Sequence, residues 1–317
     1  MKKLFTSVIV FLTVVSVYAQ QEPHFAFYTF NQQFYNPAFV GSRNTGSFTA
    51  LHRSQWLGFD GAPTTQILSF QTPIMKSRAG IGGSVSRYQI GFSYDWFAST
   101  AYSYNIKLTK DLDLRVGLQA TLEYMAFEFG SRDVVTVSQN DPALSEGEFS
   151  SKYVGNVGAG MYLTYKDLFY FGGSSPQIYP NQIGFDEFTL KTAEAFPHRY
   201  LNAGAILPIN DQLELMPNIM IKWVDQAPLD ADINFNVRYL DRIMGGLNYR
   251  VGGNKNGDSL GLLFYFQANQ KIGAGLAYEL TISDIKKYES GTVELVVRYD
   301  LRDEKTNLEN PRFFKKQ

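Results

Sequence analysis

The stretch LDLRVGLQATLEYMA, residues 112–126, decides the fold of this chain. Every second residue from Leu112 to Ala126 is apolar, and most positions between them are polar, among them Arg115 and Glu123. Successive side chains of a β-strand point to opposite faces, so the stretch predicts a strand with one apolar and one charged face. It is long enough to cross a membrane at a tilt, which takes about 9–11 residues.

The same alternation recurs along the chain from Ser47 onward. It is clearest in residues 212–223, 231–239 and 292–301, where aliphatic and aromatic residues alternate with charged or amide residues. We expect about fourteen strands separated by turn residues, with starts near residues 47, 64, 79, 96, 112, 153, 167, 199, 212, 231, 242, 259, 271 and 291. Periodicity alone does not decide whether the apolar faces meet inside a soluble sandwich or face lipid.

The lengths of the connections favour a membrane barrel over a sandwich. Tight turns centre on residues 110–111, 166–167, 210–211, 241–242 and 269–270, and longer connections span 129–151, 174–197, 224–229, 252–258 and 283–290. Bacterial outer-membrane barrels have short periplasmic turns, long extracellular loops and aromatic girdles, and Tyr94, Trp96, Trp223 and Tyr299 fall near predicted strand ends. We therefore predict an all-β, antiparallel transmembrane outer-membrane β-barrel of about 14 strands over residues 46–302, with a polar interior and both termini periplasmic.

Residues 1–19 are predicted to be a signal peptide. A basic pair, an apolar core at residues 4–15 and a small-residue cleavage motif ending at Ala19 follow one another. The apolar core is too short for a membrane-spanning helix. We expect the mature chain in the cell outer membrane, with cleavage near Ala19/Gln20 and a periplasmic C-terminal tail at residues 303–317.

Composition and motifs give no support to an enzyme or a metal protein. The chain has no cysteine, which excludes disulfides, thiol catalysis and Cys-based metal sites. Its net charge is −1, so it lacks the excess positive charge that is typical of proteins that bind nucleic acids. No second ligand stands at metal spacing from His24, His52 or His198. The glycines at 80–83 and 158–160 lack the signature of a phosphate loop, and residues 254–258 lack the closing glutamate of a calcium loop. We therefore predict no enzymatic activity, no cofactor, no metal and no nucleic-acid partner.

The charged residues on the polar faces admit two interpretations. They could form a catalytic or selective constellation, or mixed-sign ladders that neutralise one another in a wet interior. No Ser-His or Asp-His pairing stands out, which favours the ladders. The residues concerned are Arg115, Glu123, Glu214, Lys222, Arg238, Glu279, Glu294 and Arg298.

The residues ahead of the first strand, 20–45, are predicted to form a periplasmic or plug-like segment. The segment is rich in aromatic residues without strand alternation, and Asn36-Pro37 favours a turn. It could tuck under or into the barrel and shield apolar side chains, or present a docking surface to a periplasmic partner. The sequence leaves both possibilities open.

Four features of the sequence stand out together: the Tyr-Asn-Pro-Ala box at 35–38 with Gly41-Ser42, the stretch RSQWLGFDGAPTTQ at 53–66, Thr72-Pro73, and PRFF at 311–314. In these features the chain resembles the PorP/SprF family of membrane proteins of the type IX secretion system. The resemblance covers essentially the mature chain. The chain departs from the expected pattern at its end, because residues 315–317 follow the Phe pair and the chain does not end on an aromatic residue. The last strand would then be residues 293–301, and the tail would lie outside the barrel.

The resemblance implies a non-enzymatic component of the type IX protein secretion system. Such a protein supports export or surface attachment of large secreted proteins, gliding adhesins among them, or anchors periplasmic machine subunits. The implied partners are outer-membrane lipid, periplasmic ring and lipoprotein subunits, and large secreted cargo with a C-terminal signal domain. The matching family-motif or partner-contact residues are Tyr35, Asn36, Pro37, Gly41, Arg53, Gln55, Trp56, Gly58, Gly61, Pro63, Pro311, Arg312, Phe313 and Phe314.

Some alternatives remain open at the level of sequence. The loop from Trp56 to Pro63 suits a rigid turn at the extracellular end of the first hairpin, where it could plug the barrel, contact a partner, or only fix the hairpin. A barrel of about fourteen strands could also leave a lumen, as in an outer-membrane porin or hydrophobic-substrate transporter. An outer-membrane enzyme and a soluble secreted β-protein are the remaining rivals.

Overall fold

The computed structural model describes residues 23–43, 45–128, 149–183, 193–225, 227–252 and 257–301. The predicted signal peptide, the C-terminal tail with its PRFF motif, and residues 254–256 of the calcium-loop resemblance lie outside the described residues. Among the described residues, no helix is long and apolar enough to cross a membrane.

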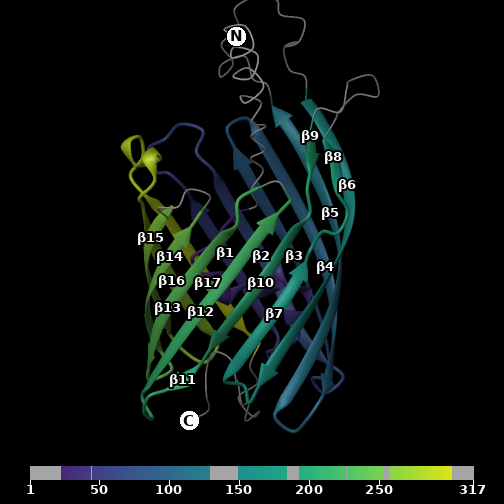
Figure 1. The fold of residues 1–317 in the computed structure, drawn as a ribbon, viewed down its shortest axis with the longest axis vertical. Helices are drawn as coiled ribbons and strands as arrows, with labels where there is room; N and C mark the ends of the chain where they lie inside the picture. The colour runs from purple at the N-terminus through teal and green to yellow at the C-terminus, as the bar shows by residue number, and fades with distance from the viewer. Residues whose placement is uncertain are drawn as a thin grey trace, which may run out of the picture.

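Fourteen antiparallel strands of the described residues form a closed barrel, as predicted (Figure 1). Each strand pairs with the next, and β1 pairs with β17 to close the ring. β11 (Leu207–Pro208) adds a short pairing beside β12, and β8 (Asn181–Ile183) with β9 (Ala193–Ala195) forms a separate two-stranded sheet. The barrel strands are β1 (Ser47–Ser54), β2 (Thr64–Ile74), β3 (Ala79–Ile90), β4 (Ser93–Lys107), β5 (Leu112–Glu128), β6 (Phe149–Tyr165), β7 (Phe169–Ser175), β10 (His198–Ala205), β12 (Leu213–Val224), β13 (Asp230–Tyr239), β14 (Ile243–Val251), β15 (Ser259–Gln267), β16 (Ile272–Thr281) and β17 (Thr292–Asp300).

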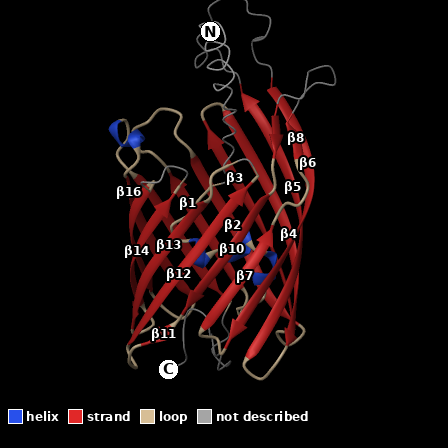
Figure 2. Ribbon diagram, viewed as in Figure 1, coloured by secondary structure: helices blue, strands red, loops and turns tan. Residues whose placement is uncertain are grey.

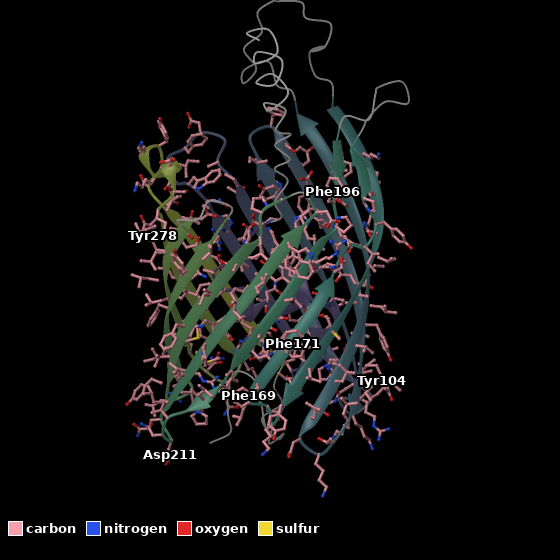
Figure 3. All side chains as sticks on the ribbon, viewed as in Figure 1. Tyr104, Phe169, Phe171, Phe196, Asp211 and Tyr278 are labelled. Atoms are coloured by element: carbon pink, nitrogen blue, oxygen red, sulfur yellow. The ribbon has the colours of Figure 1, made fainter. Side chains whose placement is uncertain are left out.

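The apolar faces of the strands point outward and the polar faces point inward. In β15, buried and exposed residues alternate without exception over its nine residues. Leu118 of β5 is 66% exposed, whereas Glu294 and Arg298 of β17 are 0% exposed. Aromatic residues such as Tyr104, Phe169 and Tyr278 also project outward, near the two ends of the wall (Figure 3). This inside-out arrangement suits a wall surrounded by lipid, as predicted from the alternation together with the sorting of short and long connections.

The two ends of the barrel differ in their connections. One end, here called the short-turn end, has the turns at residues 75–78, 108–111, 166–168, 240–242 and 268–271, and the connection at 206–212 that contains β11. In the turns at 166–167 and 240–241 both central residues have positive φ, the geometry that matches the twist of a hairpin. The other end, the long-loop end, has the connections at 55–63 and 282–291, the latter containing η3 (Asp284–Lys287), and the described parts of three further connections, 176–183 with 193–197, 225 with 227–229, and 252 with 257–258. Residues 129–148, between β5 and β6, lie outside the described residues.

One connection departs from this sorting. At the long-loop end, β3 and β4 are joined by Gly91 and Phe92 alone, with Gly91 at a φ of 54°. The tight turn lets pairing continue to Ile90 and Ser93, so β4 begins a few residues earlier than the expected position near 96.

The described residues 23–43, ahead of β1, lie inside the barrel. Residues 23–43, here called the luminal segment, include η1 (Tyr28–Phe30), α2 (Gln32–Tyr35) and η2 (Pro37–Phe39), and these short helices lie within the ring of strands (Figure 2). Ser47 and Leu301 lie together at the short-turn end, as an even strand count requires. Pro23 instead lines a cavity at the long-loop end, because the luminal segment crosses the barrel. Both ends of the chain, expected on one side of the membrane, lie outside the described residues.

Candidate functional site: a luminal segment held by buried ion pairs

The luminal segment fills the barrel with aromatic side chains. Phe25, Phe27, Tyr28, Phe30, Tyr35 and Phe39 are all at most 4% exposed. They pack on inward-facing aromatic residues of the wall, with ring centroids 4.5 Å apart for Phe30 and Tyr265, 5.0 Å for Tyr35 and Tyr200, and 5.5 Å for Phe39 and Tyr162. The wet interior expected from the polar strand faces is corrected for the described residues, because these faces surround an apolar core. Of the two possibilities left open for residues 20–45, the described part, 23–43, lies inside the barrel.

The wall binds the backbone of the segment as well as its side chains. The two carboxylate oxygens of Glu294 accept hydrogen bonds from the amides of Ala26 and Phe27, at 2.9 and 2.8 Å. Asn234 donates to the carbonyl of Ala26 at 2.8 Å, and Ser174 donates to the carbonyl of Tyr35 at 2.8 Å. Buried backbone groups need partners, and a segment with little regular structure must find them on the wall.

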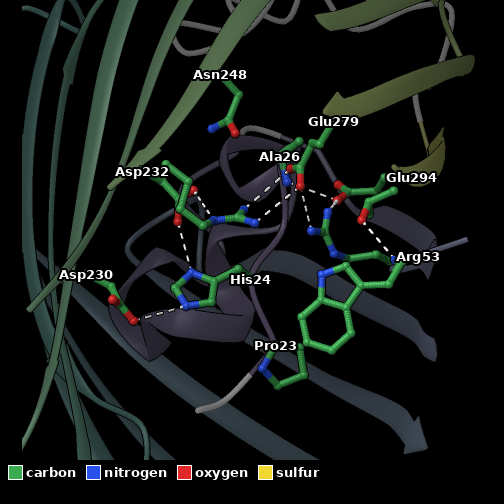
Figure 4. Close-up of polar contacts among 12 residues, drawn as sticks. Pro23, His24, Ala26, Arg53, Asp230, Asp232, Asn248, Glu279 and Glu294 are labelled. Carbon is green, nitrogen blue, oxygen red and sulfur yellow. Dashed lines mark hydrogen bonds and ion pairs between the residues drawn. The ribbon is translucent and has the colours of Figure 1, made fainter. Parts of the chain in front are cut away.

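Around these contacts lies a cluster of charged and ionisable side chains, here called the ion network: His24, Arg53, Asp232, Arg250, Glu279 and Glu294. Figure 4 shows the contacts among them. Arg53 contacts Glu279 at 2.6 Å and Glu294 at 3.0 Å. Arg250 contacts Asp232 at 2.8 Å and Glu279 at 3.2 Å. Arg53 and Glu294 face each other across the β1–β17 pairing, so the ion network spans the closing seam of the barrel.

His24 connects the luminal segment to the ion network. Its Nδ1 lies 3.0 Å from Asp232, and its Nε2 lies 3.5 Å from Asp230 and 2.8 Å from Nζ of Lys222. The segment is therefore attached to the wall at its first described residues by charged and polar groups. Among the described residues, no group of His, Cys, Asp and Glu is arranged to hold a metal ion.

A second charged cluster lies toward the short-turn end. Arg43 contacts Asp300 at 3.0 Å, and Arg298 lies 3.5 Å from the same carboxylate. The guanidinium of Arg298 also lies 5.5 Å from the ring centroids of Phe30 and Tyr265, a cation–π arrangement. A neighbouring pair joins Arg238 and Glu214 across strands β13 and β12. The predicted ladders of mixed charge are present here, but they are buried against the luminal segment.

Glycines allow the segment to lie directly against the wall. A Cβ on Gly80 would lie 2.4 Å from the carbonyl oxygen of Val40, and one on Gly117 would lie 2.3 Å from the backbone nitrogen of Ala38. Gly41 has a φ of 68° and faces Gly80, so both its conformation and its surroundings favour glycine. These glycines are contact points between backbones rather than ligand loops.

The structure places the family-motif residues in two separate regions. Tyr35, Asn36, Pro37 and Gly41 lie in the lumen, where Asn36 caps η2 by accepting from the amide of Ala38 at 2.9 Å and Pro37 occupies the first helical position. Arg53 belongs to the ion network. Gln55, Trp56, Gly58, Gly61 and Pro63 lie at the long-loop end, and Pro311, Arg312, Phe313 and Phe314 lie outside the described residues.

The loop from Trp56 to Pro63 is pinned to its neighbours. Leu57 donates to Gly291 at 2.8 Å and accepts from Ser290 at 2.8 Å, and Gly91 donates to Gly61 at 2.9 Å. Trp56 has a φ of 52°, a left-handed conformation that is unfavourable for a bulky residue. Such strain persists only where surrounding contacts impose it, and the amide of Trp56 donates to Thr292 at 3.2 Å.

The same loop lines a cavity of about 560 Å³ at the long-loop end, here called the mouth cavity. Pro23, His24, Arg53, Trp56, Pro228 and Asp258 are among its lining residues. Burial, followed by the nearby carboxylate of Asp230, raises the pKa of Asp258. A second cavity of about 520 Å³ opens at the short-turn end, between Ser42, Lys76, Arg78, Lys107 and Arg115.

Sequence reasoning missed several residues that hold the segment. Asp230, Asp232, Asn234 and Arg250 were not singled out, although Asp232 and Asn234 alternate with Ile233 and Phe235 and so belong to a polar face. The alternation could place them inward, but nothing in it shows that their partners are His24 and Ala26, some two hundred residues earlier.

Comparison with known proteins identifies a matching protein family and solved structures with a similar fold. Residues 17–299 match the family described as type IX secretion system membrane protein PorP/SprF. Among solved structures, the toluene transporter TbuX of Ralstonia pickettii has a TM-score of 0.50 at 10% sequence identity, over 85% of this chain and 92% of that one. A TodX deltaS2S3 mutant monoaromatic hydrocarbon channel has a TM-score of 0.51 at 12% identity, over 84% of this chain and 92% of that one. No curated protein matches the chain.

Proposed function

The chain belongs to the PorP/SprF family of type IX secretion system membrane proteins, and from that membership we propose a non-enzymatic role as a scaffold of the secretion system in the outer membrane. In this role it supports export or surface attachment of large secreted proteins, anchors periplasmic machine subunits, or does both. The observation that carries the proposal is the occupied lumen, since the luminal segment lies between the two end cavities and is fastened to the wall.

The occupied lumen favours a scaffold over the alternative of a porin or hydrophobic-substrate transporter. A transporter needs a path for its substrate, and here the middle of the barrel is taken up by aromatic side chains that are at most 4% exposed. The likeness to hydrocarbon channels rests on 10–12% identity and extends to the barrel fold alone. The buried charges support the same proposal, because they pair with one another and with the segment.

The proposed partners are assigned to three surfaces of the barrel: its two ends and the outward-facing apolar side of its wall. Outer-membrane lipid would contact the outward apolar faces. Periplasmic ring and lipoprotein subunits would meet the short-turn end, and large cargo with a C-terminal signal domain would meet the long-loop end, where Phe59 is 44% exposed beside Trp56. A barrel has no open sheet edge, which makes it a rigid support for such contacts.

The test is affinity purification of the tagged protein from detergent-solubilised outer membrane, followed by mass spectrometry. We expect subunits of the secretion system, a large secreted protein, or both to be enriched over a control in which an unrelated outer-membrane barrel carries the same tag. A Phe59→Ala variant should lose the secreted protein and keep periplasmic subunits if the two ends bind different partners. Recovery of neither class from the wild-type protein would count against the proposal.

A further inference from the structure

The outward face of the barrel wall carries few charges. Among the side chains of the barrel strands that the structure describes, the charged ones on this face are Arg87 and Arg199. Arg199 is paired with Asp225, at 2.8 Å. Arg87 has neutral partners instead, since its Nη2 donates to Gln89 at 2.8 Å and its guanidinium lies 5.9 Å from the ring centroid of Trp96. The wall therefore presents one outward charge that pairs with no carboxylate of the described residues.

Arg87 belongs to a compact group of polar residues at the long-loop ends of β1, β2 and β3. The group, here called the polar array, forms two rows of three across the strands: Ser54, Thr64 and Gln89, and beside them His52, Gln66 and Arg87. All six lie on the outward face, and none is buried. Neighbouring strands are about 4.8 Å apart and successive residues of one face about 7 Å apart, so the array covers roughly 10 by 7 Å. One lipid headgroup can cover such an area.

The array has apolar surroundings on three sides. In the same two rows, β17 presents Val293 and Leu295 on one side, and β4 presents Tyr94 and Trp96 on the other. The next outward row toward the middle of the wall consists of Ala50, Leu68 and Val85. Aromatic residues are typical of the boundary between hydrocarbon and headgroups. The polar array therefore lies where a headgroup meets the wall, with a surface for acyl chains directly beside it.

The side chains of the array match the groups of a phosphorylated sugar. A guanidinium carries five N–H donors in a planar fork that fits a phosphate, and within the described residues Arg87 uses one of them, for Gln89. The amides of Gln66 and Gln89 and the hydroxyls of Ser54 and Thr64 both donate and accept hydrogen bonds, which suits sugar hydroxyls. The array contains no acid that would repel a phosphate.

We propose that the polar array binds the headgroup of a phosphorylated glycolipid in the outer leaflet of the membrane. Arg87 pairs with a phosphate, the amide and hydroxyl side chains contact the sugar, and acyl chains lie over Leu68 and Val85, which are 56% and 49% exposed. The long-loop end faces the outer leaflet in the usual orientation of bacterial barrels. The proposal goes beyond the secretion role and does not depend on it, because it requires only that the barrel lies in the outer membrane.

The test is native mass spectrometry of the whole protein, purified in a mild detergent, stripped of lipid and mixed with defined lipids. The probes are diphosphorylated lipid A, the same lipid without its phosphates, and phosphatidylglycerol. We expect diphosphorylated lipid A to bind about tenfold more tightly than either of the others, since each lacks one class of contact. Equal binding of the lipid without phosphates, or of phosphatidylglycerol, would overturn the proposal. So would displacement of lipid A by inorganic phosphate at the same concentration, because the site would then recognise the ion alone.

The two outward arginines provide a matched pair of variants. Arg87→Gln should weaken the binding of diphosphorylated lipid A about tenfold, because charge-assisted hydrogen bonds are lost, whereas Arg199→Gln should bind like the wild type. The change in gel migration on heating shows that both variants are folded. Arg87→Lys, which keeps the charge and loses the fork, takes the place of Arg87→Gln if the latter does not assemble, and should also bind more weakly. An equal effect at positions 87 and 199 would overturn the proposal.

A further variant separates the sugar contacts from the phosphate contact. Gln66→Leu keeps Arg87 and removes one amide of the array, so it should reduce the preference for lipid A over phosphatidylglycerol and keep the preference for the phosphorylated form. An unchanged preference over phosphatidylglycerol would overturn the assignment of the sugar to the array. All of these measurements use the purified protein without any partner, so their failure is distinct from failure of the secretion role.

Discussion

Glu294 holds three groups at once, and none of them is close to it in sequence. It accepts from the amides of Ala26 and Phe27 and contacts the guanidinium of Arg53, and its side chain is 0% exposed. Removing one partner of a buried ion pair leaves the other without compensation, which costs far more than the pair contributes as a whole. Glu294 is therefore the residue at which the segment, the first strand and the last strand depend on one another.

The first prediction concerns this residue. Glu294→Gln removes the charge that faces Arg53 and weakens two charge-assisted hydrogen bonds, so we expect a loss of about 3 kcal/mol in stability. The measurement is the temperature or urea concentration at which the folded, fast-migrating gel band disappears. Asp211→Asn, in an exposed turn, is the matched control and should leave the midpoint unchanged. An equal midpoint for both variants would show that the ion network does not stabilise the barrel.

Backbone contact between segment and wall leads to the second prediction. In Gly117→Ala the new Cβ meets the backbone of Ala38, at 2.3 Å, where no flexible side chain can move aside. Overpacking of this kind costs about 1–3 kcal/mol. The control is Gly245→Ala, since a Cβ there meets nothing within 4 Å. We expect a lowered unfolding midpoint for the first variant only, and a similar effect of both would contradict the close approach.

Each strand of the barrel lies between two environments, the outside of the barrel on one face and the lumen on the other. β5 presents Leu118 to the outside, 66% exposed, while its neighbour Gln119 is buried. The alternation is local, since it follows from the pleat of a single strand. The turn residues are local as well, with positive φ at Lys166, Asp167, Leu240 and Asp241. These features of the wall therefore follow from neighbours in the chain and not from what fills the lumen.

The third prediction tests the outward face. Leu118→Arg places a charge in the middle of β5 on the side assigned to lipid, where arginine costs about 2–4 kcal/mol at the bilayer midplane. We expect less protein in the folded, heat-modifiable form and more in the unassembled fraction. Asp211→Arg, which adds the same side chain at an exposed turn, is the control. Equal assembly of the two variants would mean that this face does not contact lipid.

For the whole molecule, the barrel and the luminal segment form one packed unit. Fourteen strands alone would enclose a space, and the segment fills it with the aromatic side chains of residues 25–39. The chain belongs to the PorP/SprF family and forms a barrel, and the filled interior is what separates the proposed scaffold from a conducting pore.

The fourth prediction follows from the closed interior. The wild-type protein should give no steady conductance in planar bilayers, whereas deletion of residues 24–41 should give a steady one, because the aromatic filling is removed. A variant with Phe25, Phe27 and Phe30 changed to Ala keeps the chain length and should give an intermediate result, or flicker. If the deletion variant assembles and remains silent, another part of the chain closes the lumen.

The sequence alone was enough to predict the barrel, its fourteen strands and the inside-out wall. Period-two alternation, turn residues and the sorting of short and long connections can all be found along the chain without knowledge of the tertiary contacts. Residues 53–66 were likewise enough to suggest the family that the comparison shows. The contents of the lumen and the course of residues 23–43 were decided by tertiary structure alone. The contacts responsible join positions 268 residues apart, as between Ala26 and Glu294, and no local pattern marks which inward-facing carboxylate will meet which amide.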